Sequence, residues 1–210
     1  MKEEITVNKG TFANHIASYH RWGNLERLIW KDRRYELRNR IIYIFDRIDS
    51  TLYISGDFGC GVLSWFTSTN TLQDVADYSK SVGYFASKIQ TAERKYKYDY
   101  QLASEELDEF LCLDEDDEDF AILIDDRKKL KDDLLACFYS GEGYDLDDDL
   151  KDRLSDWDPD WWEDLPEGRR ISDDVQLWAF GLQQAMKQVR ERKSITSINA
   201  VDDSGRGRKE

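Results

Sequence analysis

The sequence predicts an α+β protein in which a small antiparallel sheet with helices is followed by an acidic helical region. Three observations support this prediction. Short β-branched and aromatic runs occur in the first 70 residues, helical spacing of apolar residues prevails after them, and acidic residues are concentrated beyond residue 100. At 210 residues the chain is long enough for one sizeable core with an extension.

Three runs carry the strand prediction. They are RIIYIFDR at 40–47, TLYIS at 51–55 and GVLSWFT at 61–67. An Asp49-Ser50 turn separates the first two runs, and Gly56-Asp57-Phe58-Gly59 separates the last two. Gly56 and Gly59 permit positive φ, and the Asp57 side chain is suited to bond the turn backbone. The pattern predicts an antiparallel meander with a structural turn at these residues.

Helices are expected on both sides of the strand runs. Residues 11–22 carry apolar side chains at helical spacing after Thr11, a residue suited to capping a helix N-terminus. Residues 25–35 fit either a strand or a helix. Thr71 begins a helical stretch to about Ala92, and Gly83 is the point at which this stretch can divide in two.

The chain is predicted to divide at residue 100. Residues 1–100 form the α+β hairpin domain, 101–195 an acidic helical region packed on or beside it, and 196–210 a disordered tail. The last helix is expected from Asp173 to about Arg192, with Ser172 as its N-cap.

Charge separates these parts. Residues 1–100 hold 15 Lys+Arg against 12 Asp+Glu, residues 101–175 hold 8 against 28, and residues 176–210 hold 7 against 4, which gives the net charge of -14. A segment of net charge -20 repels nucleic acid and attracts basic surfaces. No stretch approaches the roughly 18 apolar residues of a membrane helix. We therefore expect no membrane contact. The three cysteines show no CxxC spacing, so we expect them to be reduced thiols in a cytoplasm.

One set of motifs carries a family resemblance. Residues 52–59 (LYISGDFG), the aromatic pair Trp65-Phe66 and residues 84–88 (YFASK) stand in this order. They resemble a family of small phage and mobile-element proteins with a strand–GDxG–strand hairpin, an aromatic pair and a nearby lysine. The resemblance covers about residues 25–95. It implies a phage protein of a group that includes anti-CRISPR inhibitors, some of them associated with damage to guide RNA, and it assigns no catalytic residue.

The carboxylate runs are the predicted partner-binding residues. The acidic candidates are Asp114, Glu115, Asp116, Asp117, Glu118, Asp119, Asp147, Asp148, Asp149, Asp156 and Asp158. The neighbouring aromatic candidates are Trp157, Trp161 and Trp162, since tryptophan often anchors interfaces. Duplex DNA carries a charge about every 1.7 Å, so a firm acidic face can occupy a basic groove in its place. The alternative is a solvated surface or a disordered acidic loop, with the tryptophans packed beneath a loop.

The acidic residues match two kinds of metal site only in part. Asp156, Asp158, Asp160 and Glu167 match four EF-hand positions, but Trp161 replaces the required glycine. A magnesium-dependent nuclease would use clustered acids, but no (D/E)-x-K motif follows Asp160. We therefore predict no metal and no cofactor.

A basic patch lies near the N-terminus. Lys31, Arg33, Arg34, Arg38 and Arg40 interleave with Trp30 and Tyr35. The patch is either an RNA-backbone contact or the charged outer face of an element.

Together these features predict a protein that binds rather than catalyses. The expected function is that of a phage-encoded, anti-CRISPR-type inhibitor, a nucleic-acid mimic acting in the host cytoplasm on the basic channel of a Cas nuclease or its guide complex. The alternatives are a metal-dependent nuclease, or a protein recruiting one, that acts on guide RNA, and a phage interaction protein without a role in defence.

Overall fold

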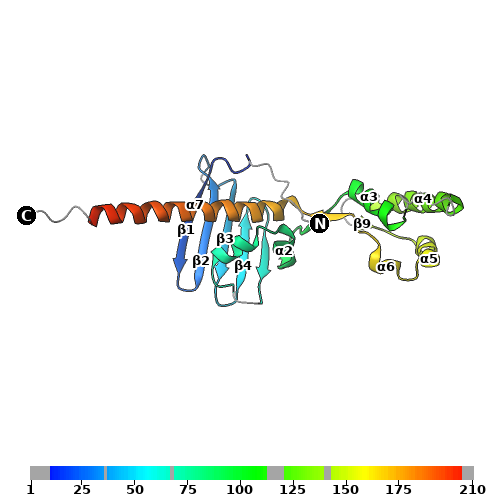
Figure 1. The fold of residues 1–210 in the computed structure, drawn as a ribbon, viewed down its shortest axis with the longest axis horizontal. Helices are drawn as coiled ribbons and strands as arrows, with labels where there is room; N and C mark the ends of the chain where they lie inside the picture. The colour runs from blue at the N-terminus through cyan, green and yellow to red at the C-terminus, as the bar shows by residue number, and fades with distance from the viewer. Residues whose placement is uncertain (1–9, 36, 67–68, 113–120, 140–142, 205–210) are drawn as a thin grey trace, which may run out of the picture. The chain divides into compact units, whose positions relative to one another are not determined.

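A six-stranded antiparallel sheet confirms the predicted α+β class (Figure 1). The computed structural model describes the chain except for residues 1–9, 36, 67–68, 113–120, 140–142 and 205–210. Neighbouring strands follow one another in chain order, so the sheet is a meander. The strands are β1 (His15–Trp22), β2 (Leu25–Asp32), β3 (Arg40–Asp46), β4 (Thr51–Gly56), β5 (Gly61–Ser64) and β6 (Ile89–Ala92).

Alternation of buried and exposed residues sets the register of the central strands. In β3, Tyr43 and Phe45 are completely buried, and they pair with the buried Ile54 and Leu52 of β4. Successive side chains of a strand point to opposite faces, so these residues form one apolar face. The strand predictions for 40–47 and 51–55 are confirmed in position by β3 and β4. Of the run predicted at 61–67, β5 takes residues 61–64, while Trp65 and Phe66 lie outside the strand and residue 67 lies outside the described residues.

The helix predicted for residues 11–22 is wrong, because β1 occupies most of that range. Its residues pair with β2 from His15 opposite Asp32 to Trp22 opposite Leu25. Gly23 turns the hairpin with a φ of +56°. The buried residues of β1 are His15 and Ala17, which alternate as in a strand. Pairing with β2 therefore decides the conformation over the helical spacing of the apolar residues.

Of residues 25–35, a segment that fits either element, residues 25–32 form β2 and the last three lie in the turn that follows it. Its buried positions alternate as in a strand, but two of the four buried side chains are the carboxylates Glu26 and Asp32. Leu28 and Trp30 complete this inner row. The acidic residues interrupt the apolar alternation that a strand prediction needs.

The β4–β5 connection is the predicted tight turn. Gly56 and Gly59 have φ of +138° and +85°, and a Cβ at Gly56 would lie 2.2 Å from the Arg40 carbonyl oxygen. Within the described part of the chain, the Asp57 side chain makes no hydrogen bond to its own turn, contrary to the prediction. Its Oδ2 accepts a hydrogen bond from the Arg40 N–H (3.0 Å), so the turn is fastened to the start of β3.

Two short helices follow β5 instead of one long stretch. They are α1 (Leu72–Tyr78) and α2 (Val82–Ser87). Thr71 is the N-cap of α1, and it forms a capping box with Asp74. The helices divide before Gly83, and the helical prediction for 89–92 is wrong because this segment pairs with β5 as β6.

The C-terminal helix α7 (Asp173–Ser204) packs on the buried face of the sheet (Figure 1). Tyr43 donates a hydrogen bond to the Trp178 carbonyl (2.8 Å), and Trp178 Nε1 donates to the Phe58 carbonyl (2.7 Å). A Cβ at Gly181 would lie 2.8 Å from the Tyr43 hydroxyl, so glycine permits this close approach. Ser172 accepts from the Val175 N–H as predicted for the N-cap (3.3 Å).

The helix also extends past its predicted end near Arg192. The tail predicted to be disordered from residue 196 is helical to Ser204, and its last six residues lie outside the described part.

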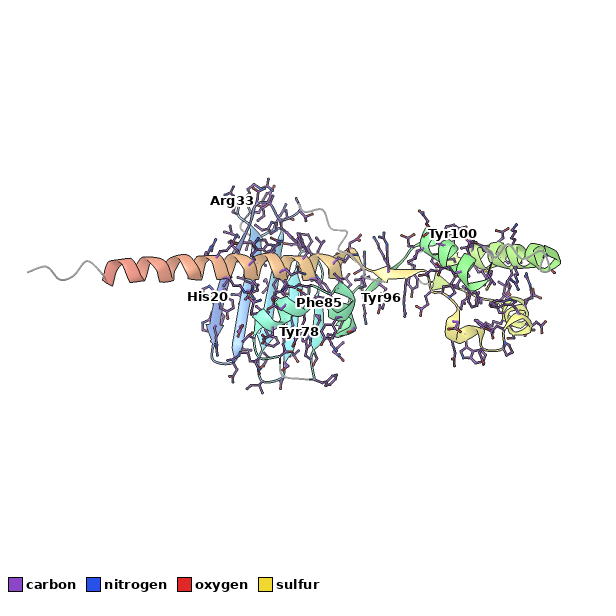
Figure 2. All side chains as sticks on the ribbon, in the orientation of Figure 1. His20, Arg33, Tyr78, Phe85, Tyr96 and Tyr100 are labelled. Carbon is purple, nitrogen blue, oxygen red and sulfur yellow. The ribbon has the colours of Figure 1, made fainter. Side chains whose placement is uncertain are left out.

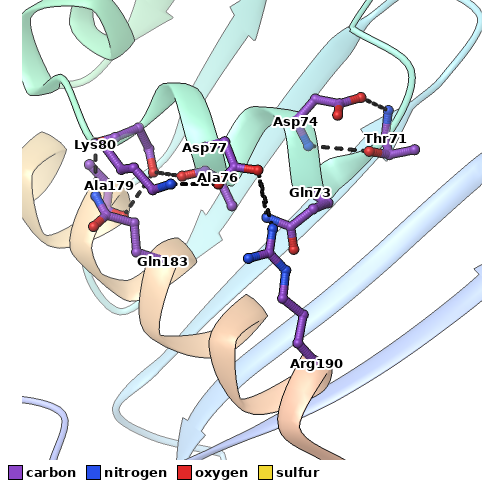
Figure 3. A network of polar contacts seen from close by, with 10 residues as sticks. Thr71, Gln73, Asp74, Ala76, Asp77, Lys80, Ala179, Gln183 and Arg190 are labelled. Carbon is purple, nitrogen blue, oxygen red and sulfur yellow. Dashed lines mark hydrogen bonds and ion pairs between the residues drawn. The ribbon is translucent and has the colours of Figure 1, made fainter. Parts of the chain in front are cut away.

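Polar contacts fix α1 against α7 (Figure 3). Asp77 accepts hydrogen bonds from Lys80 (2.7 Å) and from Arg190 of α7 (3.2 Å). Gln183 of α7 donates to the Ser79 carbonyl (2.8 Å). The helices therefore form one layer on the buried face of the sheet.

The chain forms two compact units. Unit 1 comprises residues 1–95 and 171–210, and unit 2 comprises residues 96–170. The predicted division placed the boundary at residue 100 and assigned the last helix to the acidic region, whereas α7 belongs to unit 1. Unit 2 contains β7 (Tyr96–Tyr98), α3 (Tyr100–Phe110), α4 (Ala121–Ala136), β8 (Phe138–Tyr139), β9 (Gly143–Tyr144), α5 (Asp148–Trp157) and α6 (Trp161–Asp164), and most of β10 (Arg169–Ile171), which pairs with β7.

Candidate acidic binding surface

The two units differ strongly in charge. Unit 2 holds 27 Asp+Glu against 9 Lys+Arg, a net of -18 in 75 residues. Unit 1 holds 17 against 21, a net of +4. The negative charge is therefore carried by a separate compact unit.

Unit 2 has a hydrophobic core of its own, which holds its helices together. The core consists of Ala103, Leu107, Leu111, Leu130, Leu134, Leu135, Phe138, Leu150 and Leu154. Two ion pairs join its helices at the surface, Asp108 with Lys131 (2.6 Å) and Asp133 with Arg153 (2.7 Å). The second pair connects α4 to α5, so the position of α5 is fixed by packing and by charge.

Two of the predicted partner-binding acids have structural partners in α5. Asp147 is the N-cap, and its side chain accepts a hydrogen bond from the Leu150 N–H (2.8 Å). Asp148 pairs with Lys151 at 3.2 Å. Asp158 follows the helix, and its Oδ1 accepts from the Asp160 N–H (2.9 Å). These carboxylates therefore already bind groups of their own chain, which stabilises α5 and the turn after it.

Three other acids form what we call the α5 acidic face: Asp149, Asp152 and Asp156. All three are exposed, and their spacing of three and four residues places them on one side of the helix. No ion pair or hydrogen bond involves their carboxylates within the described part of the chain. With about 1.5 Å of rise per residue, they are separated by about 4.5 and 6 Å along the helix axis.

Asp152 was missed by sequence reasoning. Leu150 and Leu154 are buried and Trp157 is half-buried, so their spacing marks the inner side of α5. This amphipathic pattern, applied to 148–157, would have placed Asp152 on the outer side with Asp149 and Asp156.

Only one of the three predicted tryptophan anchors is exposed. Trp157 packs against the core of unit 2, with its ring 4.7 Å from that of Phe110. Trp161 also packs on this core, and its Nε1 donates to Ser155 Oγ (3.1 Å). Trp162 is 59% exposed. An interface role is therefore open to Trp162, whereas the other two hold α5 and α6 in place.

A cavity of about 570 Å³ beside α5 has walls of both charge signs. Asp149 and Asp156 line it together with Arg127, Lys129 and Arg153. The Arg127 guanidinium donates to the Leu111 carbonyl (3.3 Å). The negative surface is therefore diluted on the side that faces α4.

Burial raises the pKa of one carboxyl group and one thiol of unit 2, and neither becomes a reactive group. Burial raises the pKa of Glu106, which accepts a hydrogen bond from the Gly168 N–H (3.2 Å). Burial, followed by the charges of Asp147, Asp145 and Asp133, raises the pKa of the Cys137 thiol. A thiol with a raised pKa is a poor nucleophile.

The calcium interpretation is wrong for residues 156–167. Asp156 lies in the helix α5 and residues 161–164 form α6, so no 12-residue ligand loop exists. Among the described residues no group of three or more His, Cys, Asp and Glu side chains is placed to hold a metal ion. The acidic run at 114–119 lies outside the described residues.

The basic patch of unit 1 lies at the connection from β2 to β3. Figure 2 shows Arg33 and His20 at opposite ends of the sheet. Trp30 is only 3% exposed and lies in the core, so it is excluded from an RNA contact on the surface. Arg34 pairs with Asp32 (2.6 Å), and Tyr35 remains exposed beside it.

The motifs of the family resemblance meet in unit 1. Trp65 and Phe85 are buried, with their rings 6.4 Å apart, and Lys88 Nζ lies 4.6 Å from the centre of the Tyr84 ring. Phe66 is 91% exposed. Trp65 and Phe85 therefore contribute to the packing of unit 1, whereas Phe66 does not.

Comparison of the chain with protein-family models, curated protein sequences and solved structures gave no match in any of the three. No helix in the described part of the chain is long and apolar enough to cross a membrane.

Proposed function

We propose that this protein is a phage- or mobile-element-encoded inhibitor of a host nucleic-acid-targeting defence, of the anti-CRISPR type. Unit 2 binds a channel of the effector that is lined by lysine and arginine, and it takes the place of the polynucleotide. One observation carries the proposal: a folded unit of net charge -18 holds the α5 acidic face outward without ionic partners in the described part of the chain.

The spacing of the carboxylates supports this mechanism. One strand of duplex DNA presents a charge about every 3.4 Å along its axis. The α5 acidic face presents one about every 4.5 to 6 Å along a helix. Because the spacings are of the same order, lysine and arginine side chains that reach successive phosphates can also reach these carboxylates.

The fixed position of α5 within unit 2 also supports the proposed mechanism. A decoy on a disordered segment loses conformational entropy when it binds. The buried Leu150 and Leu154 and the Asp133–Arg153 pair hold α5 in place before binding. Less of the attraction is then offset by ordering.

The test is titration calorimetry of the whole chain into a Cas nuclease, with and without guide RNA, at about 50 and 200 mM salt. We expect binding that weakens strongly at the higher salt and that competes with target DNA. The triple variant Asp149→Asn/Asp152→Asn/Asp156→Asn should weaken binding about 5- to 100-fold at low salt and flatten its salt dependence.

A matched control removes three charges elsewhere. Asp49, Glu93 and Glu191 are exposed acids of unit 1. Changing all three to their amides gives a variant with the same net charge as the α5 triple variant. If the position of the carboxylates on α5 determines affinity, this control should bind like the wild type. If only the net charge of the chain determines affinity, it should bind as weakly as the α5 variant. Salt-independent binding, or shortening of the guide RNA that requires Mg²⁺, would count against the proposal.

A further inference from the structure

Unit 1 contains a cavity of about 470 Å³ that the proposed function does not use. It lies where α7 crosses the first strands of the sheet, and its lining includes Phe12, His15, Trp30 and Phe180. Lys187 and Glu191 of α7 also border it. Cavities of this volume accommodate small organic ligands.

Aromatic rings form much of the cavity wall. Phe12 and Phe180 are stacked, with ring centres 5.9 Å apart and an interplanar angle of 22°. The rings of His15 and Trp30 lie 5.4 Å apart. Such walls favour a flat ring system over an aliphatic chain.

Three buried nitrogens at this cavity have no hydrogen-bond partner within the described part of the chain. They are Nδ1 and Nε2 of His15, which is 6% exposed, and Nε1 of Trp30, which is 3% exposed. Buried polar atoms are almost always paired in folded proteins. Two unpaired residues side by side at one cavity are therefore a sign of groups that await a ligand.

The amide of Gln188, which lines the cavity, does not supply these partners. Gln188 Oε1 accepts from the Ala17 N–H (2.7 Å), and its Nε2 donates to the His15 carbonyl (3.5 Å), so this amide serves the backbone of β1. Burial lowers the pKa of His15, although the Asp32 charge and the nearby Asn39 backbone oppose the shift. No ring nitrogen reaches hydrogen-bonding geometry with Asn39. The neutral imidazole then offers one donor and one acceptor.

We propose that this cavity binds a planar heteroaromatic ligand of the nucleobase class, with Trp30 Nε1 donating to a ring acceptor and His15 pairing with a neighbouring donor or acceptor. A nucleobase combines a flat ring with adjacent donors and acceptors in its plane. A benzenoid ring fills the same walls but leaves the three nitrogens unpaired.

The charged residues that line the cavity favour a nucleoside over a nucleotide. Lys187 attracts a phosphate, but Glu191 lies one helical turn away and repels it. The three nitrogens are sealed from solvent in the ligand-free chain, so part of the wall must move on binding. Gln184 and Lys187 are long, unbranched side chains at the cavity and can move without a change of backbone.

The test is calorimetric titration of the full chain with adenosine, guanosine, cytidine and uridine, and with indole as a ring that carries no acceptor nitrogen. We expect at least one nucleoside to bind in a 1:1 ratio and more tightly than indole. Trp30→Phe and His15→Phe should each weaken that binding by about tenfold or more.

Trp65→Phe is the matched control. Trp65 is also 3% exposed with an unpaired Nε1, but it does not line the cavity. It should bind the nucleoside like the wild type. His15→Phe removes two unpaired nitrogens, so the ligand-free variant should melt no lower than the wild type, which separates lost binding from lost folding.

The proposal is overturned if no nucleoside binds at millimolar concentration, if indole binds as tightly, or if Trp65→Phe weakens binding as much as Trp30→Phe. Nucleoside binding that appears only after deletion of residues 1–9 would make that segment the natural occupant and would also overturn it.

Discussion

Replacing Glu26 by alanine should lower the free energy of unfolding by about 2–4 kcal/mol. The Glu26 carboxylate is 2% exposed, and its Oε2 accepts a hydrogen bond from the Leu72 N–H (3.0 Å). Its Oε1 lies 3.5 Å from Arg47 Nε. Burial, followed by the charge and hydrogen bond of Glu26, raises the pKa of Tyr19 to about 12. One side chain of β2 thus joins β1, the β3–β4 turn and the start of α1.

The magnitude follows from what the truncation leaves behind. The Leu72 N–H would be buried without a partner, which costs about 1–3 kcal/mol. Breaking a fully buried ion pair costs about 3–5 kcal/mol. Arg47 is 26% exposed and keeps a hydrogen bond from Nε to the Asn70 carbonyl (2.6 Å), so the loss should fall below the top of that range.

Urea unfolding followed by circular dichroism measures this free energy. Glu26→Gln keeps an oxygen for Leu72 but loses the charge, so we expect a smaller loss of about 1 kcal/mol. Glu93→Gln, at an exposed position of unit 1, should change stability by less than about 0.5 kcal/mol. A loss below about 1 kcal/mol for Glu26→Ala, or equal losses for both Glu26 variants, would refute the assigned role.

Two further predictions concern single carboxylates. Asp147→Ala removes the N-cap of α5 and should lower the stability of this helix by about 1 kcal/mol, which should be measurable as faster amide hydrogen exchange in α5. Asp148→Ala is the control and should leave the exchange rates nearly unchanged. Equal effects of the two variants would contradict the assignment of Asp147 as the cap. Hydrogen bonding to Arg34 lowers the pKa of Asp32 to about 2, below the ordinary 3.8. The ionised Asp32 carboxylate thus stabilises the fold above about pH 4, and this stabilisation disappears as the pH falls toward 2. In thermal melts between about pH 4 and 2, the stability difference between the wild type and Asp32→Asn should therefore shrink. A difference that stays constant over this pH range would contradict the role assigned to Asp32.

The strands that could be predicted from the sequence are those whose inner positions are all apolar. In β3, Ile41, Tyr43 and Phe45 alternate with outer residues, and the period of two is evident. In β2, Glu26 and Asp32 occupy inner positions because specific partners satisfy them. Those partners come from distant segments or from the following turn, so the local sequence of β2 does not predict them.

The candidate site was predictable as a charged segment but not residue by residue. Whether an aspartate caps a helix or faces a partner depends on where the helix begins, and this separates Asp147 from Asp149. The exposure of a tryptophan likewise depends on tertiary packing, which buries most of Trp157 and leaves Trp162 outside. Composition alone treats these residues as equal.

Unit 2 lies in the chain between β6 and α7, so synthesis of the sheet and of the helix that covers it is separated by 75 intervening residues. Until α7 leaves the ribosome, only α1 and α2 can cover the apolar side of the meander, and the part that α7 covers is open to aggregation or to a chaperone. The two ends of the insertion pair as the strands β7 and β10, so a short loop could replace it without separating the two pieces of unit 1. Such a shortened chain would shield its sheet sooner during translation.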